Sequence, residues 1–269
     1  MENLSVSIIV PCYNEEKLIQ PKIANLLEQD YKGEVDITIV DGGSTDDTFR
    51  KVIQCYIPNK VVTYIAHKGK TNQLNLGLCK AKGDIVVITD VDAIMEPDSL
   101  SKVIAKFKDL NVAVVGPCSV PYKAKFLDPI AWRISNFIRM VQANRVTAPW
   151  VIGTFYAFRR GLLEQFPEDV IADDCYIALY ANFKGFKSLY IGDTVVKEIR
   201  NPYSWSDFIM HKRRKANALL REFTRFSYKM AYARPGWKCL FIGWFIFLLI
   251  VAGWSYPFFK QDSNFKRVE

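Results

Sequence analysis

Two carboxylates, Asp90 and Asp92, stand one residue apart at the end of an apolar run that reaches Thr89. Carboxylate oxygens are preferred ligands of hard divalent cations such as Mg²⁺ and Mn²⁺. We expect Asp92 to ligate such a metal together with diphosphate oxygens and water, and Asp90 to hold a ribose or a metal-bound water. Because an Asp-x-Asp pattern recurs by chance, its meaning depends on the residues around it.

Asp41 and Lys70 are further candidates for a nucleotide site. Asp41 follows an apolar run at 37–40, and its carboxylate can accept hydrogen bonds from the imide N–H of a uracil or the N–H groups of a guanine. A turn aspartate that bonds its own backbone is the alternative. Lys70 opens a helical pattern at 70–77, where a cation near a helix N-terminus suits a phosphate. A solvated lysine beside Lys68 is the alternative there.

Several common nucleotide and catalytic motifs are missing from the sequence. The turn at 11–16 reads Pro-Cys-Tyr-Asn-Glu-Glu rather than Gly-x-Gly-x-x-Gly, so a dinucleotide would lack its glycine turn. The sequence contains no P-loop pattern either. His67 and His211 are the only 2 histidines, which excludes a His-rich metal site and argues against a histidine-based triad.

The elements that must position these residues alternate between strand and helix in the first half of the chain. Short apolar strands separated by helices predict an α/β fold with a mostly parallel sheet and helices on both faces. Ligands bind such sheets at the carboxyl ends of the strands, where the loops at 11–15, 41–44 and 90–92 fall. The strand patterns lie at 5–10, 35–40, 61–66, 85–89 and 112–115, and the helical patterns at 15–29, 44–55, 72–82 and 97–110.

The second half is less regular. Strand patterns occur at 150–158 and, as a pair, at 189–199, and helical patterns at 173–183 and 204–230. Residues 126–146 mix bulky apolar side chains with arginines at roughly helical spacing. This segment is either an amphipathic helix lying on a membrane or a helix that covers the domain with its arginines in solvent.

Composition limits the class of protein. With 269 residues, 50% of them hydrophobic, the chain can bury a sizeable core and is not disordered. The formal net charge of +8 suggests a polyanionic partner such as nucleic acid, a membrane surface or a nucleotide. The 6 cysteines show no paired spacing and no signal peptide is recognisable, which indicates reduced thiols in the cytosol.

Residues 239–259 form a run without charged side chains. The length of this run suits a transmembrane helix. A buried core helix is the alternative. Basic residues concentrate before this run, so we expect a single-pass membrane protein whose catalytic domain is cytoplasmic, with no need for nucleic acid to explain the charge. The expected organisation is a catalytic domain at 1–200, a basic juxtamembrane helical segment at 201–236, a transmembrane helix at 237–259 and a short tail at 260–269.

Short motifs in a fixed order resemble those of inverting glycosyltransferases of family 2, which have the GT-A fold, a Rossmann-like, mostly parallel sheet. The resemblance runs from about residue 5 to residue 218. Each motif is short, but their order and spacing together are specific. The matching stretches are 7–15, 39–46, 70–77, 84–92 with Pro97 downstream, 153–160, and 172–174 followed by Leu179 and Gly185.

The resemblance implies transfer of a sugar from a nucleotide-activated donor to a hydroxyl, with inversion at the anomeric carbon. Asp174 aligns with the family's catalytic base, which deprotonates the acceptor as it attacks. A helix N-terminal carboxylate that interacts with the macrodipole is the alternative for Asp174. Asp92 would hold Mg²⁺ or Mn²⁺, which neutralises the leaving diphosphate. The implied donor-binding residues are Pro11, Tyr13, Glu15, Asp41, Lys70, Asn75, Asp90 and Arg214.

The sequence departs from the family at its later Gln-x-x-Arg-Trp motif. His211 stands in place of Gln and Lys215 in place of Trp, whereas Arg214 keeps the arginine and could bind diphosphate. A juxtamembrane basic patch is the alternative for this stretch. The departure favours addition of one or a few sugars over processive synthesis. We expect the acceptor to be a hydroxyl or phosphate of a membrane-held lipid-linked molecule. A UDP-sugar is the favoured donor. A processive polysaccharide synthase subunit, a sugar-phosphate nucleotidyltransferase and an inactive membrane scaffold are the alternatives.

Overall fold

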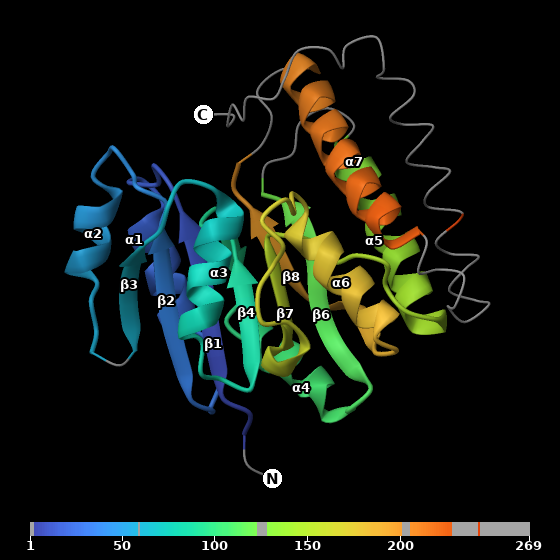
Figure 1. Ribbon diagram of the computed structural model, residues 1–269, viewed down its shortest axis with the longest axis horizontal. Coiled ribbons are helices and arrows are strands. Elements are labelled where there is room, and N and C mark those ends of the chain that lie inside the picture. The colour runs from blue at the N-terminus through green and yellow to red at the C-terminus, as the bar shows by residue number, and fades with distance from the viewer. Residues whose placement is uncertain (1–2, 59, 123–127, 201–204, 228–241, 243–269) are drawn as a thin grey trace.

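The structure is a computed structural model, and it describes residues 3–58, 60–122, 128–200, 205–227 and 242. Within these residues the strands form one 8-stranded sheet in the order β3-β2-β1-β4-β7-β6-β8-β5 (Figure 1). The strands are β1 (Val6–Cys12), β2 (Val35–Asp41), β3 (Val61–Ile65), β4 (Ile85–Thr89), β5 (Ala93–Met95), β6 (Val112–Pro121), β7 (Phe155–Arg159) and β8 (Lys187–Glu198).

One half of the sheet is parallel and the other half is mixed. Strands β3, β2, β1 and β4 run parallel to one another, as the sequence predicts. Beyond β4 the sheet is mixed, because β7 is antiparallel to both β4 and β6, whereas β6 runs in the same direction as β4. The strand pair expected at 189–199 is a single strand, β8, which is parallel to β6 with a shift of register and antiparallel to β5. An apolar run does not specify strand direction, so the sequence could not show this reversal.

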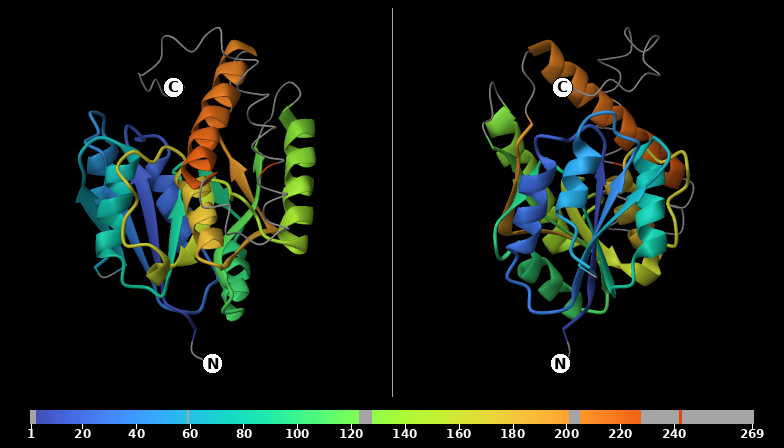
Figure 2. Two further views of the ribbon diagram at one scale, coloured as in Figure 1. Left: turned by 45° about the vertical axis from the view of Figure 1, so that its right-hand side comes forward. Right: turned by 90° about the vertical axis from the view of Figure 1, so that its left-hand side faces the viewer.

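Helices cover both faces of the sheet, as expected. On one side lie α1 (Ile19–Leu27), α2 (Thr48–Gln54) and α4 (Ser99–Ala105), and on the other α3 (Lys70–Lys80), α6 (Asp173–Phe183) and α7 (Trp205–Ser227). The right-hand view of Figure 2 looks at the edge of the sheet, with α1 and α3 on opposite sides.

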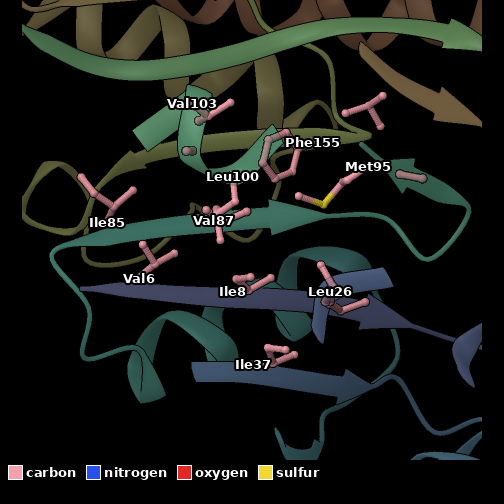
Figure 3. Close-up of a cluster of buried hydrophobic side chains, with 14 of the residues drawn as sticks. Val6, Ile8, Leu26, Ile37, Ile85, Val87, Met95, Leu100, Val103 and Phe155 are labelled. Atoms are coloured by element: carbon pink, nitrogen blue, oxygen red, sulfur yellow. The ribbon is translucent and has the colours of Figure 1, made fainter. Parts of the chain in front are cut away.

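The strands alternate between these two layers because successive side chains of a strand point to opposite faces. In β1, Ile9 joins the cluster under α3 and α6, whereas Ile8 and Val10 join the cluster under α1 and α4. Figure 3 shows this second cluster, in which Ile8 lies close to Leu26 and Val87. Because the strands are buried on both faces, their carboxyl ends are fixed and can carry a precise site.

The segment expected at 126–146 contains helix α5 (Asp128–Arg145), as both alternatives for it predicted. This helix packs on β6 and β8. Among the residues that the structure describes, no helix combines the length and apolar character needed to cross a membrane. The transmembrane helix expected at 237–259 falls outside these residues except for residue 242, as do the tail at 260–269 and the ends of the basic segment at 201–236. Those assignments stay predictions.

Candidate active site

The loops that follow β1 and β2 are bonded to each other. The Asn14 backbone N–H donates to Ser44 Oγ at 2.9 Å, and the Thr45 N–H donates to Asn14 Oδ1 at 2.8 Å. From α3, Gln73 Nε2 donates to the carbonyl oxygens of Cys12 at 2.5 Å and Val40 at 2.9 Å. Two of the three strand-end loops that the sequence singles out therefore form one surface.

Asp41, the last residue of β2, lies in this surface and is 1% exposed. Its Oδ1 accepts the Ser44 N–H at 2.7 Å, so the carboxylate does bond its own turn. Its Oδ2 is buried, and no residue in the described part of the chain hydrogen-bonds it. A buried acceptor without a partner is costly, and an N–H donor of a nucleobase would satisfy it. The turn alternative for Asp41 is therefore seen at Oδ1, whereas the expected contact of Oδ2 with a nucleobase stays a prediction.

Glu15, which is buried, forms an ion pair with the exposed Arg200 beside the same loops. Arg200 Nη1 donates to Glu15 Oε1 at 2.9 Å, and its Nη2 bonds Glu15 Oε2. The Glu15 N–H donates to Thr48 Oγ1 at 2.6 Å. Arg200 follows β8, and the sequence offers no motif that identifies it. Glu15 therefore joins the loop after β1 to the end of β8, and its expected contact with the donor stays a prediction.

The Asp90 and Asp92 pair follows β4 and faces other acidic groups. Burial, the charge of Asp90 and the charge of Glu198 raise the pKa of Asp92 to about 7, although Arg200 acts in the opposite direction. Negative charge is therefore concentrated here, which is the environment that a bound divalent cation neutralises. Among the described residues no group of three or more His, Cys, Asp or Glu side chains is arranged to hold a metal by itself. A cation on Asp92 would take its other ligands from diphosphate and water.

Lys70, the first residue of α3, joins the Asp90 side to the Asp174 side of the site. Its ammonium lies 3.1 Å from Asp90 Oδ1 and 3.2 Å from Asp173 Oδ1. Although burial opposes it, the charges of Asp173 and Asp90 hold the pKa of the Lys70 ammonium above its ordinary value. Tyr156 of β7 donates its hydroxyl to Asp173 Oδ2 at 2.5 Å. Asp173 thus bonds both a cation and a hydroxyl, a role that the sequence did not suggest.

Asp174 lies at the start of α6. Its Oδ1 accepts the Cys175 N–H at 2.8 Å, and a β-carbon added at Gly153 would come within 3.4 Å of Oδ2. The glycine therefore leaves space beside Oδ2. Burial and the charge of Asp173 raise the pKa of Asp174 to about 6, against the opposing charge of Lys70. A carboxylate that titrates near neutrality can accept a proton, as a general base must.

The structure shows contacts or positions of other kinds for the remaining expected donor-binding residues. Asn75 bonds the backbone of Phe166, with Nδ2 2.9 Å from its carbonyl oxygen and Oδ1 2.7 Å from its N–H. Pro11 is a buried residue of β1, and Tyr13 lies under the Lys68 ammonium, which is 5.2 Å from the ring centroid. Arg214 is an exposed residue of α7. Their contacts with a donor stay predictions.

Comparison with known proteins places this arrangement in a family. The family model for Glycosyl transferase family 2 matches residues 7–166, which is more than half of the chain. The chain therefore belongs to glycosyl transferase family 2 and has a GT-A-like fold, and nucleotide-sugar glycosyl transfer is the class of activity that this family supports. This leaves the sugar-phosphate nucleotidyltransferase alternative without support.

Relatives and solved structures extend the comparison. An N-acetylglucosaminyltransferase of Mesorhizobium japonicum is 25% identical over 241 residues, 81% of this chain and 56% of the relative. A poly-beta-1,6-N-acetyl-D-glucosamine synthase of Staphylococcus aureus is 26% identical over 196 residues, 69% of this chain and 47% of the relative. The chain thus spans about half the length of the curated relatives it matches.

Two solved structures share the fold. A mannosyltransferase from Pyrobaculum calidifontis, in complex with GDP-Man and Mn²⁺, superposes with a TM-score of 0.80 and 28% identity, over 96% of this chain and 73% of that one. S. aureus TarS in complex with UDP-GlcNAc superposes with a TM-score of 0.66 over 95% of this chain and 75% of that one. At 18% identity, the second likeness concerns the fold alone.

Proposed function

We propose that the protein transfers a sugar from a nucleoside-diphosphate sugar, favoured as a UDP-sugar, to a membrane-held lipid-linked acceptor with inversion. The observation that carries this proposal is the bridging of Asp90 and Asp173 by Lys70, with ammonium–carboxylate distances of 3.1 and 3.2 Å. The bridge supports the proposal, because Asp90 is an expected donor residue and Asp173 directly precedes Asp174, the expected base, at the start of α6. A donor held at Asp90 and an acceptor held at Asp174 would then be neighbours.

The donor half of the proposal rests on the strand-end loops. Asp41 Oδ2 would accept an N–H of the nucleobase, and Asp90 a ribose hydroxyl. Asp92 would hold Mg²⁺ or Mn²⁺, which when bound neutralises the charge that develops on the leaving diphosphate. The Mn²⁺ in the related mannosyltransferase structure supports this assignment. Of the remaining candidates, Lys70 and Arg214 are the cations that would contact diphosphate, with Pro11, Tyr13, Glu15 and Asn75 shaping the pocket.

The acceptor half rests on Asp174. Because Oδ1 is engaged by the Cys175 N–H, we assign proton transfer to Oδ2. As the acceptor hydroxyl loses its proton to Oδ2, its oxygen bonds the anomeric carbon and the bond from that carbon to the diphosphate breaks, which inverts the centre. A phosphate acceptor is already ionised and would need no base.

The lipid acceptor and the membrane location are supported by helix α5. Ile134, Phe137 and Ile138 occupy one face of it and are exposed, with Phe137 at 64%. Apolar side chains at this spacing on one helix face are typical of helices that lie on membranes. The uncharged run at 239–259 supports a single-pass protein with this domain in the cytoplasm. One observation favours the second candidate, a processive synthase subunit, which is the similarity to the S. aureus polysaccharide synthase.

The proposal is tested by a donor screen. Membranes that contain the full chain are incubated with radiolabelled UDP- and GDP-sugars and Mn²⁺, and label is measured in the lipid extract and in the polymer fraction. We expect lipid-borne label in products of one or a few sugars, lost with EDTA and in Asp92→Asn. Asp98→Asn is the control, because Asp98 pairs with Lys102 on the surface at 2.7 Å. Long polymer would favour the synthase, activity that persists with EDTA would refute the metal, and no transfer from any donor would refute the function.

A further inference from the structure

Helix α1 carries a lysine on its buried face. Lys22 is 3% exposed and lies on the same face as Ile19, Ile23 and Leu26, which belong to the core under α1. Placing an ammonium group in an apolar layer is costly unless it is well bonded. Burial lowers the pKa of Lys22 to about 7, although the charges of Asp90 and Asp92 act in the opposite direction. Because burying the Lys22 ammonium group is costly, we expect this side chain to have a role that compensates for the cost.

The Lys22 ammonium bonds both ends of the segment that holds Asp90 and Asp92. Its Nζ donates to Thr89 Oγ1 at 2.8 Å and to the carbonyl oxygen of Ala93 at 2.6 Å. Thr89 is the last residue of β4 and Ala93 the first of β5, so these two contacts flank the carboxylates directly. The lysine reaches them from α1, an element that is 67 residues away from Thr89 in the chain.

The segment is held from the opposite side as well. Thr89 Oγ1 donates to the carbonyl oxygen of Thr154 at 2.8 Å, and the Asp90 N–H donates to the same oxygen at 3.1 Å. The Ile199 N–H donates to the carbonyl oxygen of Asp92 at 2.8 Å. These contacts come from residues next to β7 and β8, whereas Lys22 holds the segment from α1, in the other layer.

We propose that Lys22 is a positioning residue that fixes the distance between the two ends of the Asp90–Asp92 segment and thereby orients its carboxylates. Neither carboxylate hydrogen-bonds Lys22, so the lysine acts through Thr89 and Ala93 and does not itself occupy the carboxylate oxygens, of which Asp90 Oδ1 pairs with Lys70. Groups behind a metal ligand orient it, and their removal typically lowers metal affinity 10- to 100-fold. The ordering of the segment is independent of the proposed function, whereas the consequence for metal affinity rests on it.

The test compares the full-length wild type with Lys22→Met, which keeps the length of the side chain but removes both hydrogen bonds. Ile23→Val is the matched control, because Ile23 is the next residue of α1, is 1% exposed and contacts the same core. Hydrogen exchange of residues 90–93 is measured without metal. Mn²⁺ affinity is measured by the electron paramagnetic resonance signal of free Mn²⁺, with UDP and separately with GDP.

We expect the backbone amide hydrogens of residues 90–93 to exchange faster in Lys22→Met than in Ile23→Val. Lys22→Met should also bind Mn²⁺ at least about tenfold more weakly. Excess Mn²⁺ should then restore its turnover. Thr89→Val should also speed exchange, and its effect should be less than additive with that of Lys22→Met, because the two side chains share the hydrogen bond from Lys22 Nζ to Thr89 Oγ1.

Two results would overturn the proposal. One is exchange in Lys22→Met equal to that in the control, which would make Lys22 a general stabiliser of α1. The other is tighter Mn²⁺ binding in Lys22→Met, because removal of a nearby positive charge would then outweigh any loss of order. A wild type that binds no Mn²⁺ while Lys22→Met still exchanges faster would refute the metal assignment and support the positioning role.

Discussion

The protonation of Asp174 offers the sharpest check on the proposed base. Burial and the charge of Asp173 raise its pKa to about 6. A group with that pKa is ionised in about nine-tenths of molecules at pH 7 and in about one-tenth at pH 5. Turnover should therefore fall about tenfold per pH unit below pH 6. A carboxylate that only interacts with the helix macrodipole would instead have a lowered pKa and give no such decline.

The substitution Asp174→Asn removes the base and keeps the shape. Loss of a general base typically lowers the rate about 10²- to 10⁴-fold, equivalent to about 3–5 kcal/mol of transition-state stabilisation. Donor affinity should stay unchanged, because the proposed contact of Asp174 is with the acceptor. Since the folded pKa lies above the unfolded value of 3.8, the native state binds more protons between about pH 4 and 6, and stability falls as pH rises through this window. At pH 7.5 the ionised carboxylate opposes folding, so the variant should not melt below the wild type.

Three measurements check this reasoning: kcat from pH 5 to 8, thermal melts at pH 5 and 7.5, and binding of the nucleotide donor. Asp169→Asn is the control, because Asp169 carries the same chemistry five residues away but pairs with Arg221 and Arg225 of α7 at 3.1 and 2.6 Å. Its turnover should match the wild type. A lower Tm for Asp174→Asn at pH 7.5 with turnover retained would make Asp174 a helix-stabilising residue and refute the base.

Two further substitutions separate donor binding from support of the fold. Asp41→Asn should weaken binding of UDP or GDP by about 10- to 100-fold, because a hydrogen bond to a charged group contributes about 1.5–3 kcal/mol; titration calorimetry that shows unchanged affinity would contradict the nucleobase contact. Asn75→Ala should lower the Tm and kcat with little change in the donor KM, because Asn75 holds the Phe166 backbone in the segment before α6. A selective rise in donor KM would instead favour the donor-binding role expected from the sequence.

The parallel half of the sheet was predictable because its signal is local. Five or six apolar residues, a loop and a helical pattern repeat through β4, and such repetition has few folded solutions. The second half lacks that repetition. The direction of β7 is decided by its pairing with β4 and β6, which are antiparallel to it, and no residue between Phe155 and Arg159 encodes that choice.

The same distinction between local and distant information divides the candidate site. The strand-end positions of Asp41, Asp90 and Asp92 were predictable, because Asp41 ends one apolar strand and the other two stand just after another. Arg200 was missed because its ion pair with Glu15 spans 185 residues, a partnership that no spacing rule reveals. For Lys22 a weak signal did exist.

That signal is the position of Lys22 three residues after Ile19 and four before Leu26, on the apolar face of a predicted helix. A lysine there breaks the amphipathic pattern, and a break of this kind indicates either a snorkelling side chain or a buried polar contact. Only the structure decides between them, because the contact partners, Thr89 and Ala93, lie far along the chain.

The position of Lys70 limits how the roles of single residues can be measured. One ammonium group serves Asp90 on the donor side and Asp173 beside the base, so the two halves of the site share a charge. Removing Lys70 would leave two carboxylates without their cation and would also take away the charge that lowers the pKa of Asp174. A loss of activity in such a variant would therefore combine effects on donor binding and on proton transfer. The effects of substituting groups that interact this closely do not add. The contribution of Lys70 to the donor side or to the base side can therefore be obtained only from double-mutant cycles with Asp90 and with Asp173.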